Sequence, residues 1–196
     1  MRFSINILKA DPQADIARTW TAARAAPSAQ PGFVEAKLHR VYKQLNRDGY
    51  SHVSMEAWSS PEACGKVHTT PENLYEIVNQ GRSADWAPDP GNLIVTNPYR
   101  IPPDEAERHA EMWDTSKRHM ETREGFVDAY LFRAVDKNSE YFFVSRAEWR
   151  SEELFMRQFS GKDFKQIVKP FEGIFAICLS HVVATVKPSI QAEVVG

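Results

Sequence analysis

Three side chains in two neighbouring segments could together carry out acid–base chemistry. His39 lies in the segment at 33–42, and His52 and Glu56 lie in the segment at 50–58. If these segments pair as an antiparallel hairpin, the two imidazoles can touch across the strands. A neutral imidazole is a competent base near pH 7, and a carboxylate can hold its imidazolium partner. We therefore predict His52 as a general base, His39 as its partner and Glu56 as the group that supports them.

Two other interpretations of these three residues stay open. The histidines could form a half-exposed polar pair at the rim of a sheet, since perturbed ionisable groups mark functional sites only statistically. Two histidines and a glutamate could also bind a metal ion, but their spacing fits no recognisable ligand motif. We expect no metal here.

The two segments belong to a pattern that occurs twice in the chain. The matched stretches are PGFVEAKLHR at 31–40 with EGFVDAYLFR at 124–133, and YSHVSMEAWSS at 50–60 with YFFVSRAEWRS at 141–151. The first pair is offset by 93 positions and the second by 91, so the first copy has two extra residues in the intervening turn. A period this long exceeds the ~20–50 residues of solenoid repeats. We expect two small domains, at 1–92 and 93–196, that face each other as a pseudo-twofold pair.

Periodicity, caps and turn residues predict a similar order of elements in each copy. In the first copy we expect a strand at 3–9, a helix that opens at Asp11-Pro12, strands at 33–42 and 50–58, and a helix from Ser60 to about Gln80. In the second we expect a strand at 93–101, a helix after Pro102, strands at 126–135 and 140–149, a helix capped by Ser151 and a strand at 174–186. The second order, β-α-β-β-α-β, is ferredoxin-like.

The end of the first copy can be interpreted in two ways. The first copy has no obvious final strand, and residues 81–92 are rich in Gly and Pro, which favours a linker. The strand that begins at 93 could instead serve both copies.

The helix after Pro102 carries His109, Met112, Trp113, Ser116 and Met120 on one face, although solvent exposure is the default expectation for His109 and His119.

With these motifs in view, the chain resembles the antibiotic biosynthesis monooxygenase family of the dimeric α/β-barrel superfamily. The resemblance rests on a Gly-Phe-Val strand start that ends in Leu-x-Arg, followed by Phe-Val-Ser-x-Ala-Glu-Trp-x-Ser-x-Glu. It covers 95–186 in the second copy and, more loosely, 1–80 in the first. It implies an α+β fold in which two ferredoxin-like (βαββαβ) units pack as a pseudo-twofold dimeric α/β barrel within one chain. It also implies that each sheet has one face under its helices and the other toward the barrel cavity.

Strand alternation then sorts the residues of this expected cavity face. The face would carry Tyr141, Phe143, Ser145, Ala147 and Trp149 in the second copy, and Tyr50, His52, Ser54, Glu56 and Trp58 in the first. Counting residues across each hairpin puts Phe132 opposite Phe143 and His39 opposite His52. One half of the cavity would then be aromatic and the other polar.

Within the resembled family, quinone-forming members line their active cavity with the strand Trp, an Asn four residues earlier and a Tyr six residues later. Here Trp58 and Trp149 are kept, Ser54 and Ser145 stand at the Asn position, and Cys64 and Phe155 stand at the Tyr position. Asn97 matches the first-strand Asn of the haem-degrading branch. The positions of that branch's haem-ligating His hold Ile77 and Val168, which cannot bind iron.

The resemblance implies a cofactor-independent monooxygenase that oxidises an aromatic or polyphenolic small molecule with O₂, as quinone-forming polyketide-tailoring enzymes do. Trp58 and Trp149 would stack the substrate, and the other expected binding residues are Ser54, Ser145, Tyr50, Tyr141, Phe143 and Asn97. The nine glycines form no GxGxxG or P-loop pattern, so we expect no nucleotide cofactor. A non-redox binding, cyclase or isomerase barrel is the alternative, because fold does not fix function.

Composition excludes several partner classes. The net charge of −2 gives no reason to expect nucleic acid or an anionic membrane as partner. No stretch approaches the ~20 apolar residues of a membrane span, and the N-terminus shows no signal-type segment. Cys64 and Cys178 form no CxxC pair, which favours reduced thiols. We expect a cytoplasmic protein whose partners are the substrate, O₂ and, as an open alternative, a second copy in a homodimer.

Overall fold

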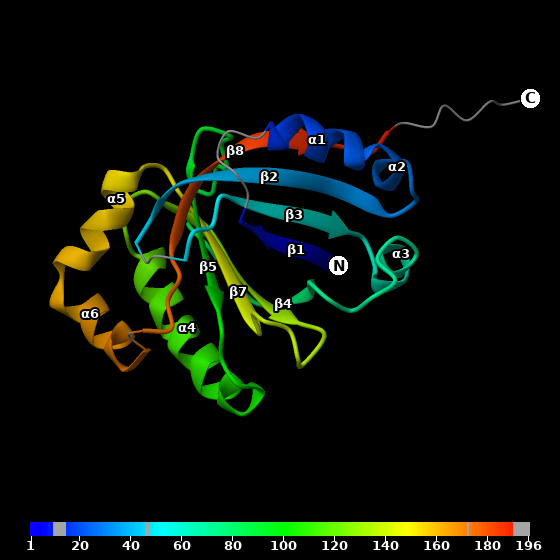
Figure 1. The fold of residues 1–196 in the computed structure, drawn as a ribbon. Coiled ribbons are helices and arrows are strands. Elements are labelled where there is room, and N and C mark those ends of the chain that lie inside the picture. Colours follow the sequence, from blue (N-terminus) through cyan, green and yellow to red (C-terminus); the bar gives the residue numbers. More distant parts are fainter. Residues whose placement is uncertain (10–14, 46–47, 172, 190–196) are drawn as a thin grey trace, which may run out of the picture.

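The computed structural model describes residues 1–9, 15–45, 48–171 and 173–189. Its eight strands close into one antiparallel barrel in the order β1-β3-β2-β8-β5-β7-β6-β4 (Figure 1). The strands are β1 Arg2–Leu8, β2 Phe33–Gln44, β3 His52–Trp58, β4 Leu74–Arg82, β5 Leu93–Tyr99, β6 Phe126–Ala134, β7 Phe143–Trp149 and β8 Cys178–Val186. The helices are α1 Ile16–Ala23, α2 Ala25–Ser28, α3 Pro61–Gly65, α4 Ala106–Glu121, α5 Glu152–Arg157 and α6 Lys162–Val168.

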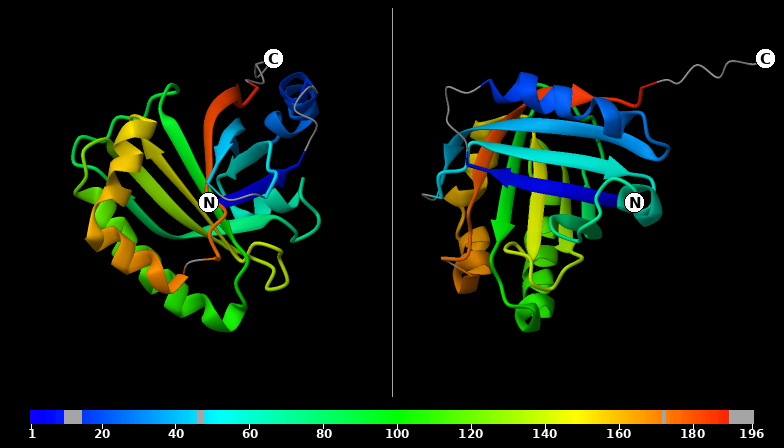
Figure 2. Two further views of the ribbon diagram at one scale, coloured as in Figure 1. Left: turned by 60° about the vertical axis from the view of Figure 1, so that its left-hand side comes forward. Right: turned by 45° about the vertical axis from the view of Figure 1, so that its right-hand side comes forward.

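The barrel consists of two ferredoxin-like sheets joined edge to edge. Strands β4-β1-β3-β2 form the first sheet and β8-β5-β7-β6 the second, and the pairs β2–β8 and β4–β6 join them. Helices α4, α5 and α6 cover the outer face of the second sheet, whereas α1 and α2 lie on the first (Figure 2). The expected α+β fold of two ferredoxin-like units in one pseudo-twofold barrel is therefore confirmed.

The predicted helix from Ser60 to Gln80 is wrong. Helix α3 ends at Gly65, and residues 74–82 form β4, which pairs with β6 of the second unit. Asn73 takes a positive φ of 59°, a left-handed conformation that a helix interior does not accept. The following LYEIV is rich in β-branched and aromatic residues, which favour strands. The first unit thus has its own final strand, and 83–92 connects β4 to β5; the division at 92/93 stays a proposal.

The predicted start of the first helix, at Asp11 and Pro12, lies outside the described residues. Helix α1 starts at Ile16, where the Asp15 side chain accepts a hydrogen bond from the Arg18 amide at 3.2 Å. An Asp at this position satisfies one of the free amides of the first turn. Ser60 and Ser151 cap α3 and α5 in the same way.

The repeated glycine of the two motifs has a conformational reason. Gly32 and Gly125 take φ of 90° and 84°, and each carbonyl accepts the amide of the residue after the strand tryptophan at 2.8 Å. A Cβ at Gly32 would lie 2.5 Å from the Ala63 side chain, and one at Gly125 would lie 2.5 Å from Leu154. Any larger residue would therefore push away the helix that follows β3 or β7.

A β-bulge changes the face on which the candidate histidines lie. In the first hairpin the register shifts between Phe33 and Glu35, and the second shifts between Phe126 and Asp128. Beyond each bulge the pairing moves by one residue, so His39 lies opposite Val53, and Phe132 opposite Val144. A shift of one residue moves a side chain to the other face of the sheet. The predicted His39–His52 and Phe132–Phe143 pairs are therefore wrong.

Candidate functional site

The first candidate site is a cavity between the second sheet and its helices. Its volume is about 110 Å³, and its walls are almost entirely apolar. Strands β5, β6 and β7 form the floor, with Val95, Ala129 and Ala147 among their side chains. Helix α4 and the segment from α5 to β8 form the cover with Met112, Trp113, Ser116, Met120, Phe155, Gln158, Phe159, Phe164, Val168, Phe175 and Ile177. We call this space the helix-side cavity.

Three polar residues cluster in the floor of the helix-side cavity. Asn97 accepts a hydrogen bond from the Ala176 amide at 2.7 Å, which fixes the orientation of its carboxamide. The Tyr99 hydroxyl lies 3.1 Å from Ser145 Oγ and also hydrogen-bonds Asn97. Burial raises the pKa of Tyr99 to about 12, against the opposing effect of these two hydrogen bonds. At neutral pH the cavity therefore presents neutral hydroxyl and amide groups to a ligand.

Behind Tyr99 lies a buried histidine. His109 is 1% exposed, and its ring packs on Tyr99 at 4.2 Å and stacks on Phe143 at 5.4 Å between centroids. Burial lowers the pKa of His109 to about 4, so the ring is neutral at pH 7. The expected exposure of His109 is wrong, while the predicted α4 face of His109, Met112, Trp113, Ser116 and Met120 is buried throughout.

The equivalent strand positions in the first unit carry an ion-pair cluster. Glu56 is 3% exposed, and its oxygens lie 2.9 Å from Arg24 and 3.0 Å from His68. Trp20 donates a hydrogen bond to Ser54 at 2.8 Å. Ala147 and Ser145 stand at the positions of Glu56 and Ser54, but no such cluster forms around them. The two units therefore differ here, and the open helix-side space lies in the second unit, whereas the residues predicted from the sequence to be catalytic lie in the first.

This cluster makes stability depend on pH. Burial raises the pKa of Glu56, but the hydrogen bond from His68 and the charge of Arg24 outweigh it, so the pKa is lowered from 4.5. A lowered carboxyl pKa gives stability above the unfolded pKa that is lost as pH falls through the folded one. We expect Glu56→Gln to lower the free energy of unfolding, measured with denaturant at pH 7, by about 1–3 kcal/mol. Between pH 5 and 3 the free energy of unfolding of this variant should decline less than that of the parent. Glu152→Gln, which removes an exposed pair with Lys43, is the control; equal effects of both would contradict this role.

The second candidate site is the interior of the barrel. Its cavity of about 380 Å³ is lined by the inward-facing side chains of both sheets, and we call it the barrel cavity. His39, Lys37 and Met55 come from the first unit, and Tyr130 and Phe132 from the second. His39 and the outer residue His52 are thus separated by the sheet.

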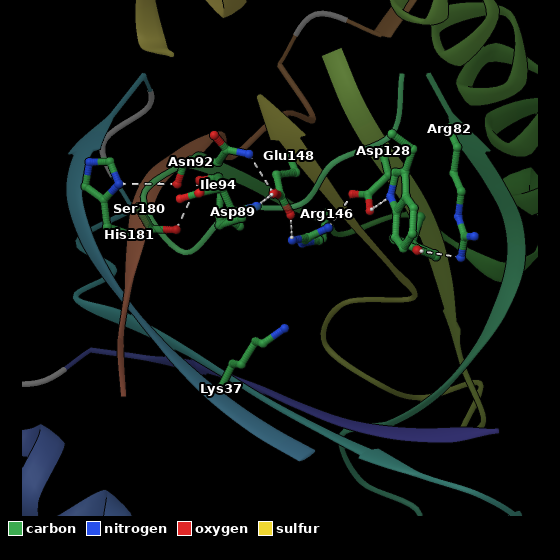
Figure 3. A network of polar contacts seen from close by, with 12 residues as sticks. Lys37, Arg82, Asp89, Asn92, Ile94, Asp128, Arg146, Glu148, Ser180 and His181 are labelled. Atoms are coloured by element: carbon green, nitrogen blue, oxygen red, sulfur yellow. Dashed lines mark hydrogen bonds and ion pairs between the residues drawn. The ribbon is translucent and has the colours of Figure 1, made fainter. Parts of the chain in front are cut away.

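A buried network of charges closes one side of the barrel cavity (Figure 3). Arg146 bonds Asp128 and also Glu148, the latter at 2.5 Å, and both carboxylates are 3% exposed. The connecting segment 83–92 folds over them. Trp86 donates to Asp128 at 3.0 Å, and the Asp89 amide and the Asn92 side chain donate to Glu148 at 2.9 and 2.8 Å; these contacts give residues 83–92 a structural role.

Comparison with known proteins bears on the second unit. Residues 92–170 match the family model of antibiotic biosynthesis monooxygenase. The second unit contains an antibiotic biosynthesis monooxygenase (ABM) domain. The match includes α4, α5, α6 and the strands β5 to β7, and therefore most of the helix-side cavity. It supports a monooxygenase-type function for the chain.

Solved structures agree with the fold along nearly the whole chain. An anthrone oxidase-like protein superposes with a TM-score of 0.71 at 13% identity, over 97% of this chain and 94% of that one. A monooxygenase-like protein from Listeria innocua gives 0.54 at 14% identity over 92% of both chains. A heme-degrading enzyme from Listeria monocytogenes gives 0.52 at 13%, over 92% and 99%. At these identities the likeness shows the fold alone, and no curated protein matches the sequence.

Two expected binding residues, Ser145 and Asn97, line the helix-side cavity together with Phe155, which stands at the resembled family's Tyr position. The expectation that the strand face of Ser145 and Ala147 lines the barrel cavity is wrong, because this face lies under the helices. Tyr99 is the polar neighbour that the sequence did not single out. Its position two residues after Asn97 on β5 puts both side chains on one face, which was the available signal.

The expected stacking role of the two tryptophans does not fit their burial. Trp58 and Trp149 have no exposed surface and are not among the described residues that line either cavity. Trp58 packs on Phe33, and Trp149 packs on Phe126 and Phe155 at 5.5 and 5.6 Å. Their size makes them core residues at the ends of β3 and β7.

Tyr50 and Tyr141 meet each other rather than a ligand. Their hydroxyls lie 3.0 Å apart, and Arg100 donates to both at 3.0 and 2.9 Å. Because these two tyrosines are equivalent positions of the repeat, their contact marks the pseudo-twofold axis. Phe143 stacks on His109 beside the helix-side cavity. Ser54 and Glu56 are tied to Trp20 and Arg24.

His52 lies on the outer face of the first sheet. Its Nδ1 is 3.2 Å from Ser51 Oγ, and burial together with the charge of Arg40 lowers its pKa. Since the sheet separates it from His39, the two imidazoles cannot act as a pair. A catalytic role for His52, His39 or Glu56 individually stays a prediction. None of the described helices has the length and apolar character of a membrane span.

Proposed function

We propose that the chain oxidises a small phenol with O₂ in the helix-side cavity of its ABM domain, without a bound cofactor. The observation that carries this proposal is the hydrogen-bonded cluster of Asn97, Tyr99 and Ser145 in a mostly apolar cavity. Apolar walls with a few convergent polar groups are typical of small-molecule sites. The ring would lie against Phe155 and Trp113, with its oxygen at the polar cluster.

The chemistry needs the phenol to lose a proton and then electrons. None of the described residues that line the cavity is a carboxylate or a histidine. We infer that hydrogen bonds from the polar cluster stabilise the phenolate. This stabilisation would make a side-chain base unnecessary. The phenolate then reduces O₂. A phenol with a free para carbon gains one oxygen atom there, the second oxygen leaves as water, and no external reductant is needed.

Cavity size limits the substrate. A cavity of about 150 Å³ in another protein binds benzene, and the space here is smaller at about 110 Å³, so it can hold at most a single ring without movement of its walls. A tricyclic phenol needs α5 and α6 to move outward. We therefore expect monocyclic phenols to react faster than hydroxyanthracene-like ones.

Oxygen uptake tests the proposal. We expect the purified chain to consume one O₂ per quinone formed and to release no hydrogen peroxide. Binding of the phenols without oxygen uptake would instead support the non-redox binding or isomerase alternative. A haem Soret band or flavin fluorescence in the active protein would contradict cofactor independence.

The pH dependence of turnover should follow the substrate. Without a lining base, kcat/KM should rise with pH along the ionisation of the phenol in solution. Phenols with electron-withdrawing substituents, and hence lower pKa values, should shift the profile to lower pH by a similar amount. A profile that keeps one inflection for all substrates would reveal a protein base, with His52 the first to be replaced.

A further inference from the structure

The barrel cavity is separate from the helix-side cavity and differs in chemistry. Its rim is marked by the exposed residues Met1, Val34 and Trp86. Inside, Phe3 packs edge-on against Phe132 at 4.9 Å between centroids, and Tyr130 stacks on Phe132 at 6.1 Å. This aromatic wall and the volume of about 380 Å³ are of the size and kind that bind small ligands.

Facing this wall is an imidazole without a partner. His39 is 1% exposed and lines the barrel cavity, and among the described residues neither of its ring nitrogens has a hydrogen-bond partner. Burying such a group unpaired costs free energy, and nearly all buried polar groups in proteins are paired. A neutral imidazole has one N–H, so an acceptor oxygen of a ligand in this cavity could satisfy one of the two nitrogens.

The charges around His39 favour an anion. Lys37 points from β2 across the barrel toward Arg146 (Figure 3). Burial, followed by the charges of Arg146 and Lys37, lowers the pKa of His39 to about 3, and Glu35 opposes them only in part. The ring is thus a neutral donor in a region of positive potential. Glu35 is shared between Lys37 at 2.9 Å and Lys187 at 2.6 Å. The other carboxylates that line the cavity are paired with other cations: Glu56 with Arg24 and His68, and Asp128 and Glu148 with Arg146.

Because the two copies of the repeat differ at these positions, the barrel cavity contains this arrangement of His39 and Lys37 once and not twice. At an offset of 93, His39 corresponds to Phe132 and Lys37 to Tyr130. A symmetric barrel would carry the same side chain at both equivalent positions, whereas here a phenylalanine and a tyrosine of the second unit replace the histidine and the lysine of the first. The barrel cavity therefore has only one His39–Lys37 pair among the described residues.

We propose that the barrel cavity is a second binding site, which takes one small aromatic carboxylate per chain. Its ring packs on Phe3, Tyr130 and Phe132, and its carboxylate accepts hydrogen bonds from His39 and Lys37. Hydrogen bonds to an ionised carboxylate are the stronger kind. The site does not depend on the oxidation proposed for the ABM domain.

Titration calorimetry with 2-naphthoate tests the second site. We expect one molecule bound per chain and weaker binding of the neutral 2-naphthamide. His39→Phe, which introduces the residue of the second unit, and Lys37→Met should each weaken naphthoate binding about tenfold or more. Thermal melting of both variants shows whether the fold is kept.

Two matched variants locate the binding. His52→Phe changes a histidine on the outer face of the same sheet, and Ala147→Leu fills the helix-side cavity; both should bind naphthoate as the parent does. Loss of binding in Ala147→Leu would assign naphthoate to the ABM cavity and overturn the proposal. Unchanged binding in folded His39→Phe and Lys37→Met, or no binding to the parent at millimolar naphthoate, would overturn it as well.

Discussion

Replacing Ala147 by Leu should abolish phenol oxidation while the fold is kept. Ala147 lies on the floor of the helix-side cavity, and the added isopropyl group would occupy the space of the substrate ring. We expect kcat/KM to fall at least about 100-fold, equivalent to about 3 kcal/mol of transition-state binding. Oxygen uptake with monocyclic phenols measures the loss, and circular dichroism checks the fold.

Two further variants are compared with Ala147→Leu. Met112→Leu changes another lining residue with nearly constant volume and should keep most activity. His52→Phe tests the base predicted from the sequence, whose removal would cost about 10²–10⁴ in rate. Full activity of Ala147→Leu together with a large loss in His52→Phe would move the chemistry to the first unit and contradict the proposed site.

The largest expected effect on stability comes from Arg146. Arg146→Met, which introduces the residue found at the equivalent Met55, leaves Asp128 and Glu148 buried without their cation. Breaking a buried ion pair from one side costs about 3–5 kcal/mol, which guanidinium unfolding at pH 7 should show.

A combined variant separates charge from packing. Arg146→Met with Asp128→Asn and Glu148→Gln removes all three charges and keeps the shapes, so we expect much of the lost stability to return. If the triple variant were as unstable as Arg146→Met alone, the loss would come from packing and not from uncompensated charge.

The overall fold could be predicted because the same turn and hairpin motifs occur in both copies of the repeat. Gly32 and Gly125 are required by the same turn, and the hairpins that follow them end in the same buried tryptophan. Two copies of one order of elements leave few arrangements other than a face-to-face pair. Strand β4 was missed because Leu74, Ile77 and Val78 also fit the spacing of a helix face, although Gly65 and Pro71 separate them from α3.

The site could be predicted only in part, because it depends on one inserted residue per hairpin. A bulge after Phe33 moves His39 to the barrel cavity and leaves His52 outside, and strand alternation alone cannot show this. Asn97 and Ser145 were identified through the family resemblance and do share a cavity. The ion pairs of Glu56 in the first unit depend on Arg24 and His68, which come from segments whose docking the sequence does not specify.

A crystal structure of the chain with a monocyclic phenol bound under anaerobic conditions tests the central claim most directly, because without O₂ the substrate stays intact. We predict one phenol in the helix-side cavity of the ABM domain, with its oxygen within hydrogen-bond distance of Ser145 and Asn97. A phenol bound beside His52 on the first unit, with the helix-side cavity empty, would contradict the account.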